Sequence, residues 1–273
     1  MSGIRHRSLS VHHSICTNKP NHPIRLALPL LNAVDRSIDS ITLLPARALL
    51  NEHITHKTFI DGPVGKLEAI LAEPTSGHAR GLAVIAHPHP LYGGTMNNKV
   101  VHTLFKSFLE LGFIAVKFNF RGVEQSEGEI SSGDNSGAGE VGDVLAVAET
   151  VKIKFAERFT APVPLLLAGF SFGGAVQAYA AQQLKPQTVV MVAPAVQRLN
   201  APPIIYPDVK QSEAVAPRVL IIHGDRDDVV SLASVLEWAT PQELPIVVVP
   251  GAEHFFHRRL HILKRVVVDA CRP

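Results

Sequence analysis

The sequence has only two cysteines, Cys16 and Cys271, near opposite ends of the 273-residue chain. Two such distant cysteines exclude a disulfide framework, and neither stands in a spacing typical of a metal or redox site. The apolar runs are well short of the roughly twenty residues that cross a bilayer, so we expect neither a transmembrane helix nor a membrane partner. These features predict a cytoplasmic protein in a reducing compartment.

Clustered charge is also missing. The net charge is only +2, and it is spread along the chain without a basic block. Nucleic-acid-binding surfaces gather Lys and Arg, so we do not expect nucleic acid as a partner. The sequence does have a large apolar fraction, 46%, which suits one domain of moderate size or a domain with an extension.

Residues 1–50 differ from the rest because they hold six Arg or Lys against two Asp and show no sustained periodicity. We predict an N-terminal extension here, most simply a flexible tail, followed by one domain over residues 51–273. An organelle-targeting segment is the alternative interpretation. A secretory signal would place its apolar region closer to Met1.

Short apolar segments alternate with helical patterns from residue 53 onward. Near-continuous Val, Ile and Leu in most of the strands predict a mostly parallel sheet buried on both faces, and the first two strands suggest an antiparallel edge. The predicted strands are 55–62, 66–74, 81–87, 113–120, 163–169, 188–196, 218–224 and 245–251, and the predicted helices are 99–112, 140–159, 172–184, 231–239 and 255–270.

The motif Gly169-x-Ser171-x-Gly173 stands where a buried strand becomes a helix. Such a sharp turn exposes the serine Oγ above the sheet edge, and the flanking glycines let neighbouring backbones approach. A helix N-terminus beside the serine adds free N–H groups and a positive dipole end. The pattern predicts that Ser171 is a nucleophile.

A serine nucleophile needs a histidine base that is held by a carboxylate, and in this motif class the chain order is Ser, Asp or Glu, His. Both partners follow in that order. Strand 218–224 runs into an acidic turn with Asp225, Asp227 and Asp228, and strand 245–251 runs into a loop with His254. Each lies just past the carboxyl end of a strand, where open parallel sheets carry their sites.

Two longer motifs carry a family resemblance. His87–Met96 reads HPHPLYGGTM, and Phe118–Val123 reads FNFRGV. On these motifs the sequence resembles the α/β-hydrolase superfamily from about Thr55 to the C-terminus, and most closely its small lidless serine hydrolases of the dienelactone-hydrolase-like and esterase kind. The resemblance implies an α/β-hydrolase fold, with helices on both faces of the sheet and no large cap domain.

The resemblance also implies site residues. The family turn G-x-x-D-x-V-V places the catalytic acid at Asp227, with Asp225 or Asp228 as alternatives. The motif G-x-x-H-F-F places the base at His254, with His257 as its alternative.

Two backbone N–H groups should hold the oxyanion. One is that of Phe172, directly after the nucleophile. The other belongs to the loop after the third strand, where Pro88 and Pro90 have no N–H. His89 is the family match for this donor, and Leu91 is the alternative.

Together these residues predict a serine hydrolase that cleaves small carboxylic esters through an acyl-enzyme, without cofactor or metal. We expect an open, shallow site with a small-molecule ester as partner, because only about twenty residues separate strands 188–196 and 218–224. A thioesterase, a peptidase, an acyltransferase or a non-catalytic binding module of the same fold are the alternatives. An edge strand could support a homodimer, but nothing demands one. The predicted substrate contacts are Leu91, Tyr92, Phe170 and Tyr206.

Three other features of the sequence have weaker functional interpretations. Gly137-x-Gly139-x-x-Gly142 fits a dinucleotide fingerprint, but it follows a polar loop and not a strand. His87 and His89 could form a metal pair, but no third ligand stands with them. Glu124 replaces the glycine that is usual in the family, so that it either alters its loop or lines the pocket mouth.

Overall fold

The computed structural model describes residues 55–75, 78–131, 137–159, 162–204 and 217–272. The extension predicted over residues 1–50 lies outside this part of the chain and stays a prediction. Within the described residues, every predicted strand and helix is present and in the predicted order. The strands are β1 Thr55–Gly62, β2 Gly65–Ala72, β3 Leu82–Ala86, β4 Ile114–Phe118, β5 Leu165–Phe170, β6 Thr188–Val192, β7 Arg218–Gly224 and β8 Ile246–Val249. The α-helices are α1 Lys99–Glu110, α2 Ala138–Lys154, α3 Phe172–Leu184, α4 Leu232–Ala239 and α5 Leu260–Cys271.

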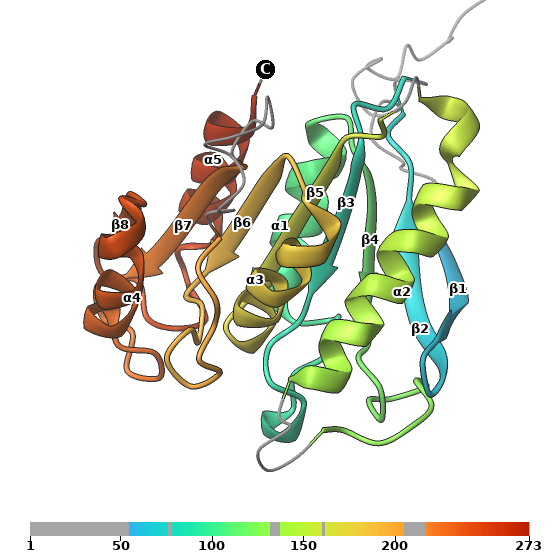
Figure 1. Ribbon diagram of the computed structural model, residues 1–273. Helices are drawn as coiled ribbons and strands as arrows, with labels where there is room; N and C mark the ends of the chain where they lie inside the picture. Colours follow the sequence, from blue (N-terminus) through green and yellow to red (C-terminus); the bar gives the residue numbers. More distant parts are fainter. Residues whose placement is uncertain (1–54, 76–77, 132–136, 160–161, 205–216, 273) are drawn as a thin grey trace, which may run out of the picture. The chain divides into compact units, whose positions relative to one another are not determined.

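The described strands form one sheet in the order β1-β2-β4-β3-β5-β6-β7-β8 (Figure 1). β1 and β2 form an antiparallel hairpin with Gly62 opposite Gly65, and β2 pairs antiparallel with β4. All the other pairings are parallel. The mostly parallel sheet and its antiparallel edge are therefore confirmed.

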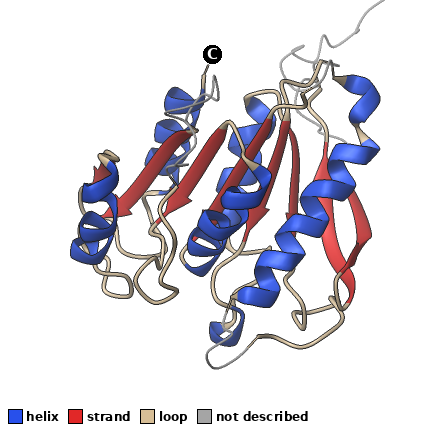
Figure 2. Cartoon of the chain, in the orientation of Figure 1, coloured by secondary structure: helices blue, strands red, loops and turns tan. Residues whose placement is uncertain are grey.

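Helices cover both faces of the sheet (Figure 2). Side chains of α2, α3 and α4 pack on one face in a cluster that includes Val84 and Leu167, and side chains of α1 and α5 pack on the other with Ala83 and Ile85. Neighbouring residues of β3 thus face opposite layers, as the period of two in a strand requires. This arrangement explains why the central strands are apolar throughout.

The last helix starts later than its apolar pattern predicts. We expected it over 255–270, but α5 begins at Leu260. Phe256 and Arg258 have φ values of 55° and 60°, in the left-handed region that an α-helix excludes. The Phe256 N–H donates to the Glu253 carbonyl at 3.0 Å, so the chain turns tightly here before it enters the helix. These turns follow directly on His254 and keep it in a loop.

Short loops at the carboxyl ends of the parallel strands gather the predicted site residues. β5 leads into Ser171, β7 into the turn with Asp227, and β8 into the loop with His254. None of the described helices is both long and apolar enough to span a membrane.

Candidate active site

Ser171 occupies a strained turn between β5 and α3. Its φ of 54° and ψ of −116° lie in a region that non-glycine residues rarely adopt. Four backbone hydrogen bonds hold it there, of which the longest, from the Ala175 N–H to the Ser171 carbonyl, is 3.3 Å. The Ser171 N–H donates to the Val192 carbonyl at 2.9 Å, and the Ser171 carbonyl accepts from the N–H groups of Gly174 and Ala195, each at 3.0 Å. Backbone strain that is held by several contacts is a frequent mark of functional sites.

Gly173, two residues after Ser171, is required by close packing. A Cβ on Gly173 would lie 2.5 Å from the His87 carbonyl oxygen at the end of β3. Only glycine lets α3 approach β3 so closely. This contact places the start of α3 beside the loop that follows β3, so both predicted oxyanion donors come from neighbouring segments.

The structure brings Ser171, His254 and Asp227 into one hydrogen-bonded chain. His254 Nε2 lies 3.1 Å from Ser171 Oγ, and His254 Nδ1 lies 2.7 Å from Asp227 Oδ2. A carboxylate only accepts, so Nδ1 carries the proton and Nε2 is left to accept from the serine hydroxyl. The tautomer is therefore the one that a general base at His254 needs, although the catalytic roles of these residues stay a prediction.

The environment of Asp227 keeps its carboxylate ionised. Burial alone would raise the pKa of this side chain, which is 0% exposed. Hydrogen bonds from His254 and from the N–H groups of Val229 and Val230 outweigh that effect and lower the pKa below its ordinary value. The two backbone donors reach Asp227 Oδ1 at 3.0 and 2.8 Å. A charged carboxylate at neutral pH can hold the imidazole and stabilise an imidazolium.

A second histidine lies behind Asp227. His223 Nε2 is 3.6 Å from Asp227 Oδ2, beyond hydrogen-bond distance, and 3.0 Å from the Val230 carbonyl, to which it donates. Burial lowers the pKa of His223, so that its imidazole is neutral beside the acid turn. His254 is thus the histidine that bonds to Asp227.

The structure places the alternative residues elsewhere. Asp225 accepts from the Gly251 N–H at 2.5 Å, and Asp228 is exposed. The His257 ring pairs with Glu253 at 3.0 Å and is 61% exposed. None of them contacts Ser171 or His254 through a hydrogen bond.

The predicted oxyanion donors face the same pocket. Among the described residues, the N–H groups of Phe172 and His89 have no hydrogen-bond acceptor, and both residues line the pocket at Ser171. The Leu91 N–H instead donates to His89 Nδ1 at 3.2 Å. The geometry therefore favours His89 over Leu91, and the assignment stays a prediction.

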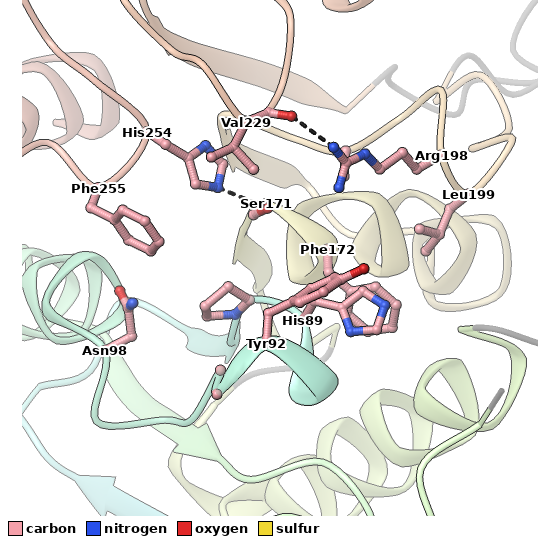
Figure 3. Close-up of a pocket in the computed structure, with 14 residues that line it drawn as sticks. His89, Tyr92, Asn98, Ser171, Phe172, Arg198, Leu199, Val229, His254 and Phe255 are labelled. Carbon is pink, nitrogen blue, oxygen red and sulfur yellow. Dashed lines mark hydrogen bonds between the residues drawn. The ribbon is translucent and has the colours of Figure 1, made fainter.

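The site pocket has a volume of about 560 Å³, within the range of small-molecule sites. Of the predicted substrate contacts, Tyr92 lines it, whereas Leu91 is 61% exposed and does not. Phe170 is wholly buried behind His254, with ring centroids 4.8 Å apart, and does not reach the pocket. Tyr206 lies outside the described residues. The described lining residues are Pro88, His89, Tyr92, Gly93, Gly94, Asn98, Ser171, Phe172, Ala195, Arg198, Leu199, Val229, His254 and Phe255 (Figure 3).

Sequence reasoning missed several lining residues. Phe255 could have been found, since it directly follows His254. Asn98 is also the N-cap of α1 and accepts from the Val100 N–H at 2.8 Å, so its sequence signal is that of a helix start. Arg198 lies in the loop after β6, outside any motif, and only the folded chain places it in the pocket.

His87 supports the loop after β3 and is not arranged as a metal ligand. Its Nδ1 donates to the Pro88 carbonyl at 2.6 Å, and its Nε2 accepts from the Phe120 N–H at 3.0 Å. Complete burial lowers the pKa of His87 to about 3. Both ring nitrogens are therefore occupied in a neutral imidazole. Across the described ranges, no three His, Cys, Asp or Glu side chains are grouped to hold a metal ion.

Two further side chains hold the loop after β4. Arg121 forms a buried ion pair with Asp143 of α2, with Nη2 and Oδ1 2.7 Å apart. Glu124 has a φ of 47°, and its Oε2 accepts from Asn119 Nδ2 at 3.1 Å. Glu124 is not among the residues that line the pocket, so it shapes its own loop. Gly137 is the N-cap of α2, and no strand is described between β4 and α2, so the structure gives no support to a dinucleotide fingerprint at Gly137, Gly139 and Gly142.

Comparison with known proteins agrees with this fold. Residues 80–262 match the alpha/beta hydrolase domain family, and the chain belongs to that family. It is 38% identical to an alpha-beta serine hydrolase homologue from Coxiella burnetii, over 79% of this chain and 97% of that one, with a TM-score of 0.66. It is 35% identical to an a/b serine hydrolase without lid from Xanthomonas campestris, over 79% and 93% of the two chains, with a TM-score of 0.64.

A relative from Rickettsia prowazekii (strain Madrid E), an uncharacterized protein, is 30% identical over 223 residues, which are 77% of this chain and 86% of the relative. With the two solved structures, this relative indicates that the likeness extends over most of the domain. The protein is thus an α/β hydrolase.

Proposed function

We propose that the protein is a serine carboxylesterase that cleaves small esters with Ser171, His254 and Asp227. The observation that carries this proposal is the hydrogen-bonded chain from Ser171 Oγ through His254 to Asp227, at 3.1 and 2.7 Å. These distances are those of a nucleophile, its base and the carboxylate that orients the base.

The proposed reaction has two halves. His254 Nε2 takes the proton of Ser171 as Oγ attacks the ester carbonyl carbon, and the N–H groups of Phe172 and His89 stabilise the oxyanion. The tetrahedral intermediate collapses, the C–O bond to the alcohol breaks, and the alcohol leaves with the proton from His254. Water then attacks the acyl-enzyme in the same way and releases the carboxylic acid and the free serine.

Pocket size and lining favour small esters. A volume of about 560 Å³ accommodates a short acyl chain or an aryl group, and Tyr92, Phe172 and Phe255 supply apolar surface. A thioesterase or a peptidase would use the same three residues. A cytoplasmic location also stays a proposal, which rests on the small number of cysteines and the short apolar runs of the sequence.

The proposal is tested with p-nitrophenyl esters from acetate to palmitate. We expect turnover of the short chains and at least a ~10³-fold loss of kcat in Ser171→Ala, because the nucleophile is gone. Ser234→Ala is the matched control, since this serine of α4 does not line the site pocket. No turnover of any ester by the folded wild type would contradict the proposal, as would full activity of Ser171→Ala.

A further inference from the structure

Arg198 gives the site pocket its only permanent charge among the described lining residues. Those residues include no Asp or Glu. The pocket also contains two histidines, His89 and His254. Burial lowers the pKa of His89, so its imidazole is neutral at neutral pH. Among the described lining residues a substrate therefore meets one cation and no carboxylate, and the charge of Glu140, which acts on His89, lies on a buried side chain behind the lining.

The guanidinium of Arg198 is held in place but not neutralised. Its Nη2 donates to the Val229 carbonyl at 2.9 Å, on the loop that also carries Asp227. No ion pair joins Arg198 to a carboxylate of the described residues. An arginine presents five N–H donors in a planar fork that matches a carboxylate. One carbonyl contact fixes the fork against the pocket wall and leaves donors for a ligand.

The pocket has two sides relative to Ser171. Arg198 and Leu199 lie on one side, and His254 and Phe255 lie on the other (Figure 3). In ester hydrolysis the leaving oxygen must be next to His254, which protonates it. The alcohol part therefore belongs on the side of His254, and the acyl part extends toward Leu199 and Arg198.

We infer that Arg198 determines specificity by binding a carboxylate at the far end of the acyl group. The preferred substrates are then monoesters of short dicarboxylic acids. This inference rests on the proposed esterase function and names its substrate class. Apolar contacts with Leu199 and Phe172 suit the methylene chain between the ester and the charge. Because Arg198 is exposed, water and salt screen the interaction, so we expect about a tenfold preference at low ionic strength.

The test compares esters that differ only in this charge. Monomethyl adipate is measured against methyl hexanoate, and monomethyl glutarate against methyl pentanoate, by proton release. We expect kcat/KM to be about tenfold higher for the anionic member of at least one pair, and the advantage to shrink as salt is added. In Arg198→Gln the ratio should fall to about one or below, and Arg198→Lys should keep part of it because the charge remains.

Two controls make the test specific. Arg265→Gln removes one positive charge from an exposed position on α5, away from the site pocket, and should keep the wild-type ratio. Competitive inhibition by adipate against hexanoate measures binding without turnover, and adipate should lose its advantage in Arg198→Gln. Acetate esters of hydroxy acids place the charge on the alcohol part and should show no such preference.

The outcomes separate the two proposals. Suppose that the wild type hydrolyses p-nitrophenyl butyrate, but that the ratio of kcat/KM between the anionic and the neutral ester is the same in the wild type and in Arg198→Gln. The role proposed for Arg198 is then wrong, and the esterase proposal stands. A preference confined to the hydroxy-acid acetates overturns the assignment of Arg198 to the acyl side. If no ester is hydrolysed by the folded wild type, the esterase proposal fails and this inference with it.

Discussion

Two buried carboxylates, Asp143 and Asp227, are bound in similar ways but to different kinds of partner. Both side chains are 0% exposed, and each is bound by one partner side chain and by backbone N–H donors, one for Asp143 and two for Asp227. Asp143 accepts the Arg121 N–H at 3.0 Å and pairs with the Arg121 guanidinium. Asp227 accepts the N–H groups of Val229 and Val230 and pairs with His254.

The difference lies in whether the partner can change its charge. Arginine stays protonated at any pH at which the protein is folded, so the pair of Asp143 with Arg121 is fixed. An imidazole can take a proton from a nucleophile and give it to a leaving group, so the pair of Asp227 with His254 suits acid–base catalysis. Similar carboxylate geometry thus stabilises a loop in one place and the proposed general base in the other.

The largest effect is expected for Asp227→Asn. An asparagine amide would donate to His254 Nδ1 and force the proton onto Nε2, which then cannot accept from Ser171. We expect kcat to fall by about 10⁴-fold, as for the equivalent change in other catalytic triads. Because His254 carries no fixed charge, the free energy of unfolding should change far less than in Asp143→Asn. Esterase kinetics and urea unfolding measure the two quantities. Wild-type kcat in the variant would contradict the assignment.

Asp143→Asn should show the opposite pattern. It leaves the guanidinium of Arg121, which is only 10% exposed, without its counter-charge. We expect a loss of about 3–5 kcal/mol in the free energy of unfolding, which is typical when one partner of a buried ion pair is removed. Below its melting temperature, the fraction that remains folded should keep measurable activity. A loss of activity as severe as in Asp227→Asn, at wild-type stability, would erase the distinction between the two carboxylates.

A smaller effect concerns His87, the buried neutral imidazole beside the site. In the unfolded chain its pKa is about 6.5, whereas in the folded protein it is about 3. Between these values the unfolded state binds a proton that the folded state does not, so stability falls as the pH drops from about 6.5 toward 3. The slope from this group is at most about 1.4 kcal/mol per pH unit.

Replacement of His87 by Asn should therefore lower stability at pH 7 but also flatten its decline with acid. Urea unfolding at several pH values between 4 and 7 measures this slope. His261→Gln, at an exposed position on α5, is the matched control and should leave the slope close to that of the wild type. An undiminished slope in His87→Asn would show that this imidazole is not the group responsible.

The smallest effect is expected for Glu124→Gly. Glycine adopts the φ of 47° without strain, but it loses the hydrogen bond from Asn119 and gains freedom in the unfolded chain. These contributions oppose each other, so we expect a net change within about 1 kcal/mol. Since Glu124 does not line the site pocket, ester kcat/KM should stay near that of the wild type. A large change in acyl-chain preference would contradict this placement.

Much of the fold could be predicted because sequence pattern and tertiary structure agree along the central strands. Buried parallel strands need continuous apolar residues, and β3, β5 and β6 have them. The start of α5 could not be predicted. Phe256 and Arg258 adopt left-handed φ values, and nothing in the sequence indicates such a conformation at a residue other than glycine. A prediction from the apolar pattern alone therefore extends the helix through this turn.

The candidate site likewise has residues that the sequence could predict and residues that it could not. Ser171, Asp227 and His254 stand in motifs, so the sequence could nominate them, and the fold brings them together. Phe170 could not be placed, because in a strand buried on both faces an apolar side chain does not reveal which layer it joins. Arg198 could not be found at all, since its contact with Val229 joins two loops that are distant in the sequence.

The most direct test of the central claim is covalent labelling of the folded protein by a fluorophosphonate, read by intact mass and by peptide mapping. We expect one adduct per chain, on Ser171, with no adduct in Ser171→Ala and slow labelling in Asp227→Asn. An adduct on another residue, or an unlabelled wild type under conditions that label a known serine hydrolase, would contradict it.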